Sequence, residues 1–438
     1  MRHHACTSPA DLVWERAWRR RAASRAATVG LAAFLALAPS GCAARSTPSS
    51  TLGAVRTATA SLTATASPTP LPSPKFVATG NMHDGRYDAT ATRLRNGMVL
   101  IAGGIKSFSF GPNPTKDYLA SAELYDPGTG KFTRTGSMIT PRSSATATLL
   151  TDGRVLIAGG EGAGPNYKSC IYGILKSAEL YDPATGKFSS TGSMLTCRAY
   201  NSATRLNDGR VLVVGGYDAW AELYDPASGK FTRTGTVPVG PYNTSPHATS
   251  TLLPDGTVFV TAGDDSLGAS LYDPSTGTFR SVPFARDPEG VASAAYITSS
   301  DRKTEPETAT LLKNGRVLVY RSTGVANDGY LETYDPATSV LTPAGAMVPH
   351  GAWGYGPVAT LLQDGRVLFT GTDVSYGAVG AASSAGIYDP TTGPGDLPSM
   401  STAREGQTAT LLDNGSVLVA GGTPDLGDGL ASAELFKP

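Results

Sequence analysis

Arginine and glutamate recur at matched positions along this 438-residue chain. In four places an arginine precedes the glycine of an Asn-Gly or Asp-Gly pair by eleven residues, and further on a glutamate precedes a tyrosine or phenylalanine by two residues. Guanidinium groups bind anionic ligands, and they also pair with carboxylates. Because both residue types occur in the same four copies, we interpret them as structural ion pairs; a ligand-binding ring of arginines is the alternative. The pairs are Arg86 with Glu123, Arg142 with Glu179, Arg198 with Glu222, and Arg404 with Glu434.

Histidine is the next residue type with candidate chemistry, because imidazole is a common metal ligand. Beyond the N-terminal segment the chain has only His83, His247 and His350, at three different distances from the nearest Asn-Gly or Asp-Gly glycine. None belongs to a set of cysteines or carboxylates at the spacing of a known metal-binding motif. The motifs of serine hydrolases, zinc proteases, EF-hands and phosphate-binding loops are also absent from the sequence. We therefore expect no metal, no cofactor and no catalytic residue.

Two cysteines, Cys170 and Cys197, lie in the repetitive part of the chain. In an oxidising compartment such a pair is a disulfide candidate. The segment around Cys170 also carries Tyr167 and Tyr172, so a bridge would hold both rings on the surface. We expect the disulfide and treat the two tyrosines as candidate ligand contacts; two unpaired thiols are the alternative.

Residues 1–42 have the features of an export signal. A basic segment around Arg20 precedes the apolar run ATVGLAAFLALA, and the motif PSGC ends at Cys42. This resembles a bacterial lipoprotein signal, in which the cysteine is lipidated, although Pro39 departs from that pattern and leaves secretory cleavage or an uncleaved anchor as alternatives. Residues 43–74 are almost wholly Ser, Thr, Ala and Pro, which predicts a disordered tether. We predict an extracytoplasmic protein, either lipid-anchored in the bacterial cell envelope or secreted.

One pattern recurs seven times within residues 75–438. Each copy has a run of small residues, an Asn-Gly or Asp-Gly pair, an apolar run that often ends in Gly-Gly, and a segment such as SAELYDP followed by TGKF. The pattern predicts four short strands, named a, b, c and d, with the pair supplying positive φ angles to a tight a–b turn. Repeats of about fifty residues with four strands are typical of propeller blades. The glycines of the pair are Gly97, Gly153, Gly209, Gly256, Gly315, Gly365 and Gly415.

The last copy ends in AELFKP and has no strand d of its own. Residues 75–82, KFVATGNM, match residues 131–138, KFTRTGSM, and precede the first strand a. We therefore predict an all-β, seven-bladed propeller of four-stranded antiparallel blades, in which the N-terminal strand completes the last blade and removes an exposed sheet edge. The tyrosines of strand c are expected to fill the wedges between neighbouring blades.

Copies four to six depart from the pattern. Copy five has Glu332 without an arginine at the usual spacing, and the segment before strand a of copy six holds His350, Trp353 and Tyr355 among glycines. Exposed aromatic rings with a polar group are typical of contact surfaces. We treat these three residues as candidate ligand contacts on the face formed by the b–c and d–a loops, the b–c/d–a face; relaxed packing is the alternative.

The Gly-Gly pairs, the YDP of strand c and the "SM…R" approach to strand a, as in Ser137, Met138 and Arg142, resemble the kelch repeat. The repeats are most similar to those of bacterial secreted kelch proteins and of the galactose oxidase propeller. The second resemblance implies a copper-radical site in which a tyrosine is followed directly by a histidine, and this chain has no Tyr-His pair. We therefore favour a non-catalytic module that binds a protein or carbohydrate ligand; a sugar-active oxidase or epimerase is the alternative.

Charge and hydropathy argue against other classes of partner. The chain has 36 Lys and Arg and 36 Asp and Glu, so no basic field exists to hold nucleic acid. Beyond the N-terminal segment no apolar stretch is long enough to span a bilayer. We expect a monomer whose contact with the membrane is made only through the N-terminal lipid or signal.

Overall fold

The computed structural model describes residues 73–109, 115–162, 170, 173–216, 218–238, 248–262, 269–282, 308–322, 329–346, 357–372, 383–424 and 427–438. The chain divides into two units, Met1–Thr69 and Pro70–Pro438, and the described residues belong to the second. The predicted signal, Cys42 and the tether as far as residue 72 lie outside them. No helix in the described part of the chain is long and apolar enough to cross a membrane.

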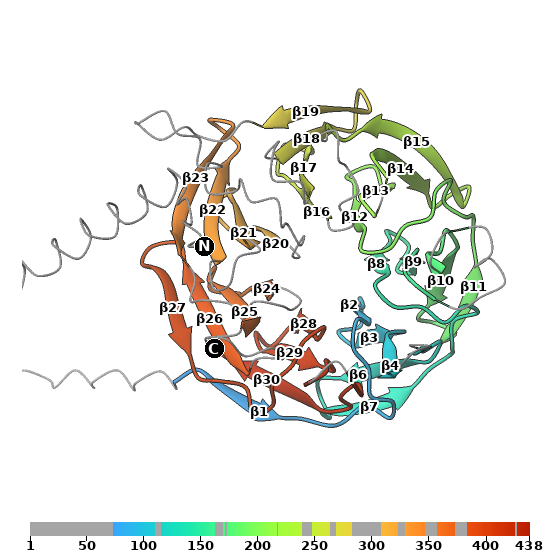
Figure 1. Cartoon of the computed structure of the whole chain (residues 1–438), viewed down its shortest axis with the longest axis vertical. Helices are drawn as coiled ribbons and strands as arrows, with labels where there is room; N and C mark the ends of the chain where they lie inside the picture. The colour runs from blue at the N-terminus through green and yellow to red at the C-terminus, as the bar shows by residue number, and fades with distance from the viewer. Residues whose placement is uncertain are drawn as a thin grey trace, which may run out of the picture. The chain divides into compact units, whose positions relative to one another are not determined.

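The described residues form seven four-stranded antiparallel sheets, which confirms the predicted propeller. The sheets surround a common axis with their first strands innermost (Figure 1). In the order a to d, blades 1 to 3 are β2 (Thr90–Arg93), β3 (Val99–Ala102), β6 (Ala122–Asp126), β7 (Lys131–Arg134); β8 (Thr146–Leu149), β9 (Val155–Ala158), β10 (Ala178–Asp182), β11 (Lys187–Ser190); and β12 (Ser202–Arg205), β13 (Val211–Val214), β14 (Trp220–Asp225), β15 (Lys230–Thr236).

The remaining blades follow the same order. Blades 4 to 7 are β16 (Ala248–Leu252), β17 (Val258–Ala262), β18 (Ala269–Asp273), β19 (Thr278–Val282); β20 (Thr308–Leu311), β21 (Val317–Ser322), β22 (Gly329–Asp335), β23 (Val340–Ala346); β24 (Val358–Leu361), β25 (Val367–Thr372), β26 (Ser384–Asp389), β27 (Gly393–Leu397); and β28 (Thr408–Leu411), β29 (Val417–Ala420), β30 (Ala433–Lys437), β1 (Lys75–Ala78).

The N-terminal strand β1 is the fourth strand of blade 7, as predicted. It runs antiparallel to β30, with Phe76 opposite Phe436 and Ala78 opposite Glu434, and Figure 1 shows the blue N-terminal strand alongside the red C-terminal one. The two phenylalanine rings lie 5.1 Å apart between centroids. The ring therefore closes through hydrogen bonds and side-chain packing between the two ends of the propeller.

The a–b turns differ from the predicted type in one respect. In all seven, the glycine of the pair has a φ between 82° and 96°, whereas the Asn or Asp before it does not take a positive φ. In blade 1 the Leu94 amide donates to Met98 and the Gly97 amide donates to Leu94, which makes a three-residue loop. Asn96 instead accepts the Met98 amide through its side chain at 3.1 Å. The Asn or Asp therefore acts through its side chain, which supports the turn.

The Gly-Gly pairs allow close contact between neighbouring blades. The Gly160 amide donates to the Arg198 carbonyl of the next blade at 2.7 Å, and a Cβ on Gly159 would lie 2.4 Å from that same oxygen. The Gly422 amide makes the equivalent bond to Arg86, at 2.9 Å, across the junction of blades 7 and 1. The junction that closes the ring therefore has the same backbone contact as a junction inside the chain.

The strand c tyrosines fill the wedges between blades. Tyr125, Tyr181 and Tyr224 are fully buried, and each packs on the phenylalanine of its own strand d with ring centroids 4.8 Å apart. Each hydroxyl also bonds a threonine of the preceding blade, as Tyr181 does with Thr135 at 2.9 Å. Burial of each ring is worth about 2 kcal/mol, so these positions are a large part of the packing between blades.

Candidate functional site

The d–a links of four neighbouring blades hold residues in the left-handed backbone region. Asp88, Ser144 and Tyr200 have φ of 52°, 50° and 58°, and Gly406 has 64°. A left-handed backbone is uncommon for a residue other than glycine, and it persists only where its surroundings enforce it. Here the amide of Asp88 donates to Gly406 at 2.8 Å, that of Ser144 to Asp88 at 2.9 Å and that of Tyr200 to Ser144 at 3.1 Å. This chain of bonds lies at the inner edge of the b–c/d–a face, where each strand a begins.

A polar cluster from three blades lies beside these links, and we name its members, Glu161, Lys116, Tyr118 and Tyr200, the Glu161 cluster. The Lys116 ammonium lies 2.6 Å from Glu161 Oε2, and the Tyr118 hydroxyl donates to the same oxygen at 3.3 Å. The Tyr200 hydroxyl donates to Glu161 Oε1 at 3.1 Å. The Glu161 side chain is 15 % exposed, so one carboxylate collects three donors in a partly buried position.

Burial, with a smaller contribution from neighbouring carboxylates, raises the pKa of the phenols in this region. Burial, followed by the charges of Asp88, Glu405 and Glu161, raises the pKa of Tyr87 to about 12. Burial and the Glu161 charge also raise the pKa of Tyr118 and of Tyr200 above the ordinary value. All three hydroxyls are therefore neutral at physiological pH, and those of Tyr118 and Tyr200 donate their protons to the Glu161 carboxylate.

Two members of the cluster come from a hairpin that lies outside the blades. Strands β4 (Ile105–Ser109) and β5 (Thr115–Tyr118) form a two-stranded sheet within the b–c connection of blade 1. The Phe108 amide donates to Gly427 at 3.1 Å and the Gly429 amide to Lys106 at 2.7 Å, so β4 also joins the b–c connection of blade 7. The hairpin thus carries Lys116 and Tyr118 from blade 1 to the carboxylate of blade 2.

The periodic arginines and glutamates lie deeper than the Glu161 cluster. Each arginine is at most 1 % exposed and contacts the glutamate of its own blade. In blade 2, Arg142 Nη1 also donates to the Gly159 and Ser177 carbonyls, at 2.9 Å each, while Glu179 accepts the amides of the d–a link. This burial supports the ion-pair interpretation over the ligand-binding ring. The N–O distances are 3.0 Å for Arg86 and Glu123, 2.7 Å for Arg142 and Glu179, 3.0 Å for Arg198 and Glu222, and 3.1 Å for Arg404 and Glu434.

Blade 5 makes an equivalent pair from a different strand. Glu332 on β22 lies 3.0 Å from Arg321, which is the fifth residue of strand b (β21) and not part of the d–a link. Both side chains are buried. Blade 5 therefore has no arginine at the regular spacing, but the paired strand β21 supplies a guanidinium to Glu332.

Cys170 and Cys197 form a disulfide, with their Cα atoms 6.1 Å apart. It joins the b–c connection of blade 2 to the d–a link before Arg198, both on the b–c/d–a face. The proposed contact residues Tyr167, Tyr172, His350, Trp353 and Tyr355 lie outside the described residues, as does His247. The remaining histidine, His83, is about half exposed and contacts Glu123 through Nδ1 at 2.8 Å.

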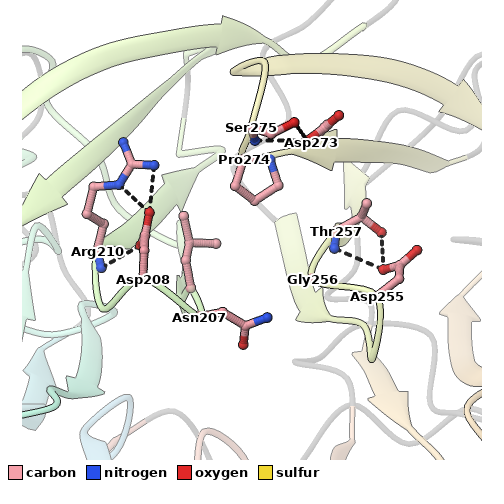
Figure 2. Close-up of a pocket in the computed structure, with 10 residues that line it drawn as sticks. Asn207, Asp208, Arg210, Asp255, Gly256, Thr257, Asp273, Pro274 and Ser275 are labelled. Atoms are coloured by element: carbon pink, nitrogen blue, oxygen red, sulfur yellow. Dashed lines mark hydrogen bonds and ion pairs between the residues drawn. The ribbon is translucent and has the colours of Figure 1, made fainter.

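A shallow groove of about 490 Å³ lies between blades 3 and 4 on the opposite face, at the a–b and c–d turns (Figure 2). Its acidic side chains bond to residues two positions further along their own turns. Asp208 pairs with Arg210 at 2.7 Å, Asp255 accepts the Thr257 amide and hydroxyl, and Asp273 accepts those of Ser275. Figure 2 shows the carboxylates directed toward these partners and not converging on a common point. The groove is therefore a weaker candidate than the Glu161 cluster.

No protein-family model and no curated protein matches this chain. Among solved structures, the chain is similar to a fungal alcohol oxidase of the AA5 family, described as catalytically diverse and in complex with copper. The match has a TM-score of 0.61 and 15 % sequence identity, and it covers 84 % of this chain and 77 % of the oxidase. At this identity the similarity shows the propeller fold and nothing about activity.

The described residues do not provide a copper site. Within the described ranges no three His, Cys, Asp or Glu side chains lie where they could hold a metal ion. The Glu161 cluster contains two tyrosines and a carboxylate, but its fourth member is a lysine, and imidazole is the usual ligand for copper in such sites. The two described cysteines are joined to each other. We therefore assign no step to copper.

Sequence reasoning did not identify the Glu161 cluster. Its members come from three blades, and Lys116 and Tyr200 are 45 and 39 positions from Glu161. One signal was present, since Glu161 follows a Gly-Gly pair where the matching residues of blades 1 and 7 are Ile105 and Thr423. An acidic side chain in only one of these copies is the departure from the repeat that could have drawn attention to this position.

Proposed function

We propose that this protein is an extracytoplasmic propeller that binds a protein or carbohydrate ligand on its b–c/d–a face and catalyses no reaction. The observation that carries the proposal is the Glu161 cluster, in which three blades direct one carboxylate, two phenols and an ammonium group to one place. Binding sites in proteins commonly combine a few convergent polar groups with aromatic rings. The left-handed residues beside the cluster support it, because enforced backbone strain is typical of functional sites.

Two features support an extracytoplasmic location. The disulfide between Cys170 and Cys197 is consistent with an oxidising compartment, where such bonds persist. The N-terminal 42 residues have the pattern of an export signal, so we propose that Cys42 carries the lipid anchor and that residues 43–74 tether the propeller to the envelope.

We also propose that the repeats belong to the kelch class. The Gly-Gly pairs, which allow neighbouring blades to approach closely, support this assignment.

The second candidate, a sugar-active enzyme on the same propeller, has no specific observation in its favour. General acid–base catalysis needs a group that can exchange protons with substrate near neutral pH. The phenols beside Glu161 have raised pKa values, and the carboxylate itself is paired with Lys116. These properties suit a site that holds a ligand by hydrogen bonds and charge.

Glycan and peptide arrays probed with the purified protein test the proposed function. We expect a specific ligand, and we expect Glu161→Gln to weaken its binding by about tenfold or more, because a charged acceptor becomes neutral. Asp364→Asn, in an a–b turn on the opposite face, is the matched control and should bind as the wild type does. A blank array with the wild-type protein would refute the proposal, and equal binding by Glu161→Gln would move the site away from this cluster.

A further inference from the structure

The Glu161 cluster already holds an ammonium group, and that group belongs to the protein itself. Lys116 Nζ lies 2.6 Å from the carboxylate, and the hydroxyls of Tyr118 and Tyr200 complete the surroundings of Glu161. We propose that this cluster is a receptor site for the side-chain ammonium of a lysine in a partner polypeptide, and that Lys116 occupies it until the partner arrives. The inference rests on the proposed function and names the ligand chemistry of the same site.

The chemistry of the cluster suits an ammonium ion. A carboxylate with little exposure supplies the opposite charge, and a charge-assisted hydrogen bond of this kind is about twice as strong as a neutral one. An ammonium ion also carries three donors, which an acceptor such as the Glu161 carboxylate can bind.

The receptor half of the site is fixed to the propeller. The Glu161 amide donates to the Ser143 carbonyl at 2.9 Å, and the Ser143 amide donates back to Glu161 at 2.8 Å. The backbone amide of Tyr200, just before blade 3, donates a hydrogen bond to the Ser144 carbonyl. The backbones that carry the carboxylate and this phenol are therefore held by bonds that do not involve Lys116.

The half that carries the occupying lysine is an addition to the blade framework. Lys116 lies on β5, and in the described part of the chain β5 pairs only with β4. Its side chain is 31 % exposed, about twice the 15 % of Glu161, so solvent and an incoming group can reach the ammonium. Its ammonium can leave the carboxylate without disturbing the seven blade sheets, because β5 belongs to none of them.

The way in which Lys116 is presented favours a polypeptide over an amino sugar. Lys116 and Tyr118 are two positions apart on one strand, and both contact Glu161, as expected for side chains on the same side of an extended chain. Glu161, with Tyr200 beside it, therefore already accommodates an extended Lys-x-Tyr segment. A partner that presents lysine from an extended segment would reproduce this contact.

Competition between the internal and external lysine gives a direct test. Lys116→Met retains most of the side-chain length but removes the ammonium, and Lys116→Gln is a second, polar replacement. We expect both variants to bind Nα-acetyl-lysine methylamide at least about tenfold more tightly than the wild type, measured by NMR titration of the tyrosine ring signals. Lys116→Arg keeps the positive charge and should remain as weak as the wild type. Adding Glu161→Gln to Lys116→Met should abolish the gain.

Two control ligands identify what is recognised. Nα-acetyl-norleucine methylamide lacks the ammonium and should not bind, and glucosamine carries the ammonium on a sugar and should bind more weakly than the lysine probe. The inference is overturned if Lys116→Met and Lys116→Gln, both with wild-type melting curves, bind the lysine probe no better than the wild type. It is also overturned if glucosamine binds more tightly than the lysine probe. A ligand found on the arrays would leave the proposed function standing in either case.

Discussion

At the scale of single residues, the buried Arg142 and Glu179 form a coupled pair 2.7 Å apart. Removing one partner leaves a buried charge without its counter-ion, which costs about 3 to 5 kcal/mol. We therefore expect Arg142→Met and Glu179→Gln each to lower the free energy of unfolding strongly, and the double variant to lose less than the sum. A double-mutant cycle by denaturant unfolding should give a coupling energy of about 1 to 3 kcal/mol.

The control for this cycle uses a pair on the surface. Arg154 and Asp152 lie 2.6 Å apart, but their side chains are 36 % and 42 % exposed, so their coupling should stay below about 1 kcal/mol. If Arg142 and Glu179 showed no more coupling than this pair, the arginine would not be a structural partner of the glutamate. The ligand-binding interpretation of the four arginines would then be the better one.

At the scale of the strand, Gly159 directly follows β9, in a place where a side chain would clash with the next blade. Its φ is 71°, and a Cβ at this position would lie 2.4 Å from the Arg198 carbonyl oxygen of the next blade. We expect Gly159→Ala to lower the free energy of unfolding by about 2 kcal/mol or more, because both the backbone conformation and the junction between blades 2 and 3 must change. Thermal unfolding followed by circular dichroism measures the loss.

Gly395 supplies the matched control on strand β27. A Cβ there would make only an ordinary contact, 3.6 Å from Ile387, and its φ is not in the left-handed region. Gly395→Ala should therefore leave the melting temperature almost unchanged or slightly raised. Equal effects of the two substitutions would mean that the Gly-Gly pair is not required for close approach between blades.

At the scale of the whole molecule, the ring depends on a strand from the opposite end of the chain. A protein that begins at residue 73 keeps β1, whereas one that begins at residue 81 loses it, together with the Thr79 hydroxyl bond to Tyr125. We expect the shorter protein to lose at least about 3 kcal/mol, from the unpaired edge of β30 and the lost contact between Phe76 and Phe436. The two melting curves measure the difference.

The protein that begins at residue 73 is the control for the shorter one, because it lacks only residues before the propeller. It should melt as the full chain does. A melting curve of the shorter protein that matched both would show that blade 7 is stable with three strands, and closure by β1 would then contribute little to the stability of the ring.

The sequence by itself determined the number of blades, their four strands and the closure by residues 75–82. These features depend on local chemistry: the glycine of each a–b turn needs a left-handed backbone, and the small and aromatic residues repeat with the strands they occupy. The turn type was only partly predicted, because Asn96 acts through its side chain and not through a positive φ. That choice depends on the length of the loop, which the two-residue motif does not specify.

Only the tertiary structure decided which residues meet on the b–c/d–a face. Glu161, Lys116 and Tyr200 belong to three blades, and they converge because the inner strands form a ring and the b–c connection of blade 1 reaches across to blade 2. No local pattern encodes these contacts, since they depend on the curvature of the ring and on loops whose spacing varies from blade to blade. The pair of Arg321 and Glu332 is different, because the two residues lie on neighbouring strands of one blade and only the strand pairing brings them together.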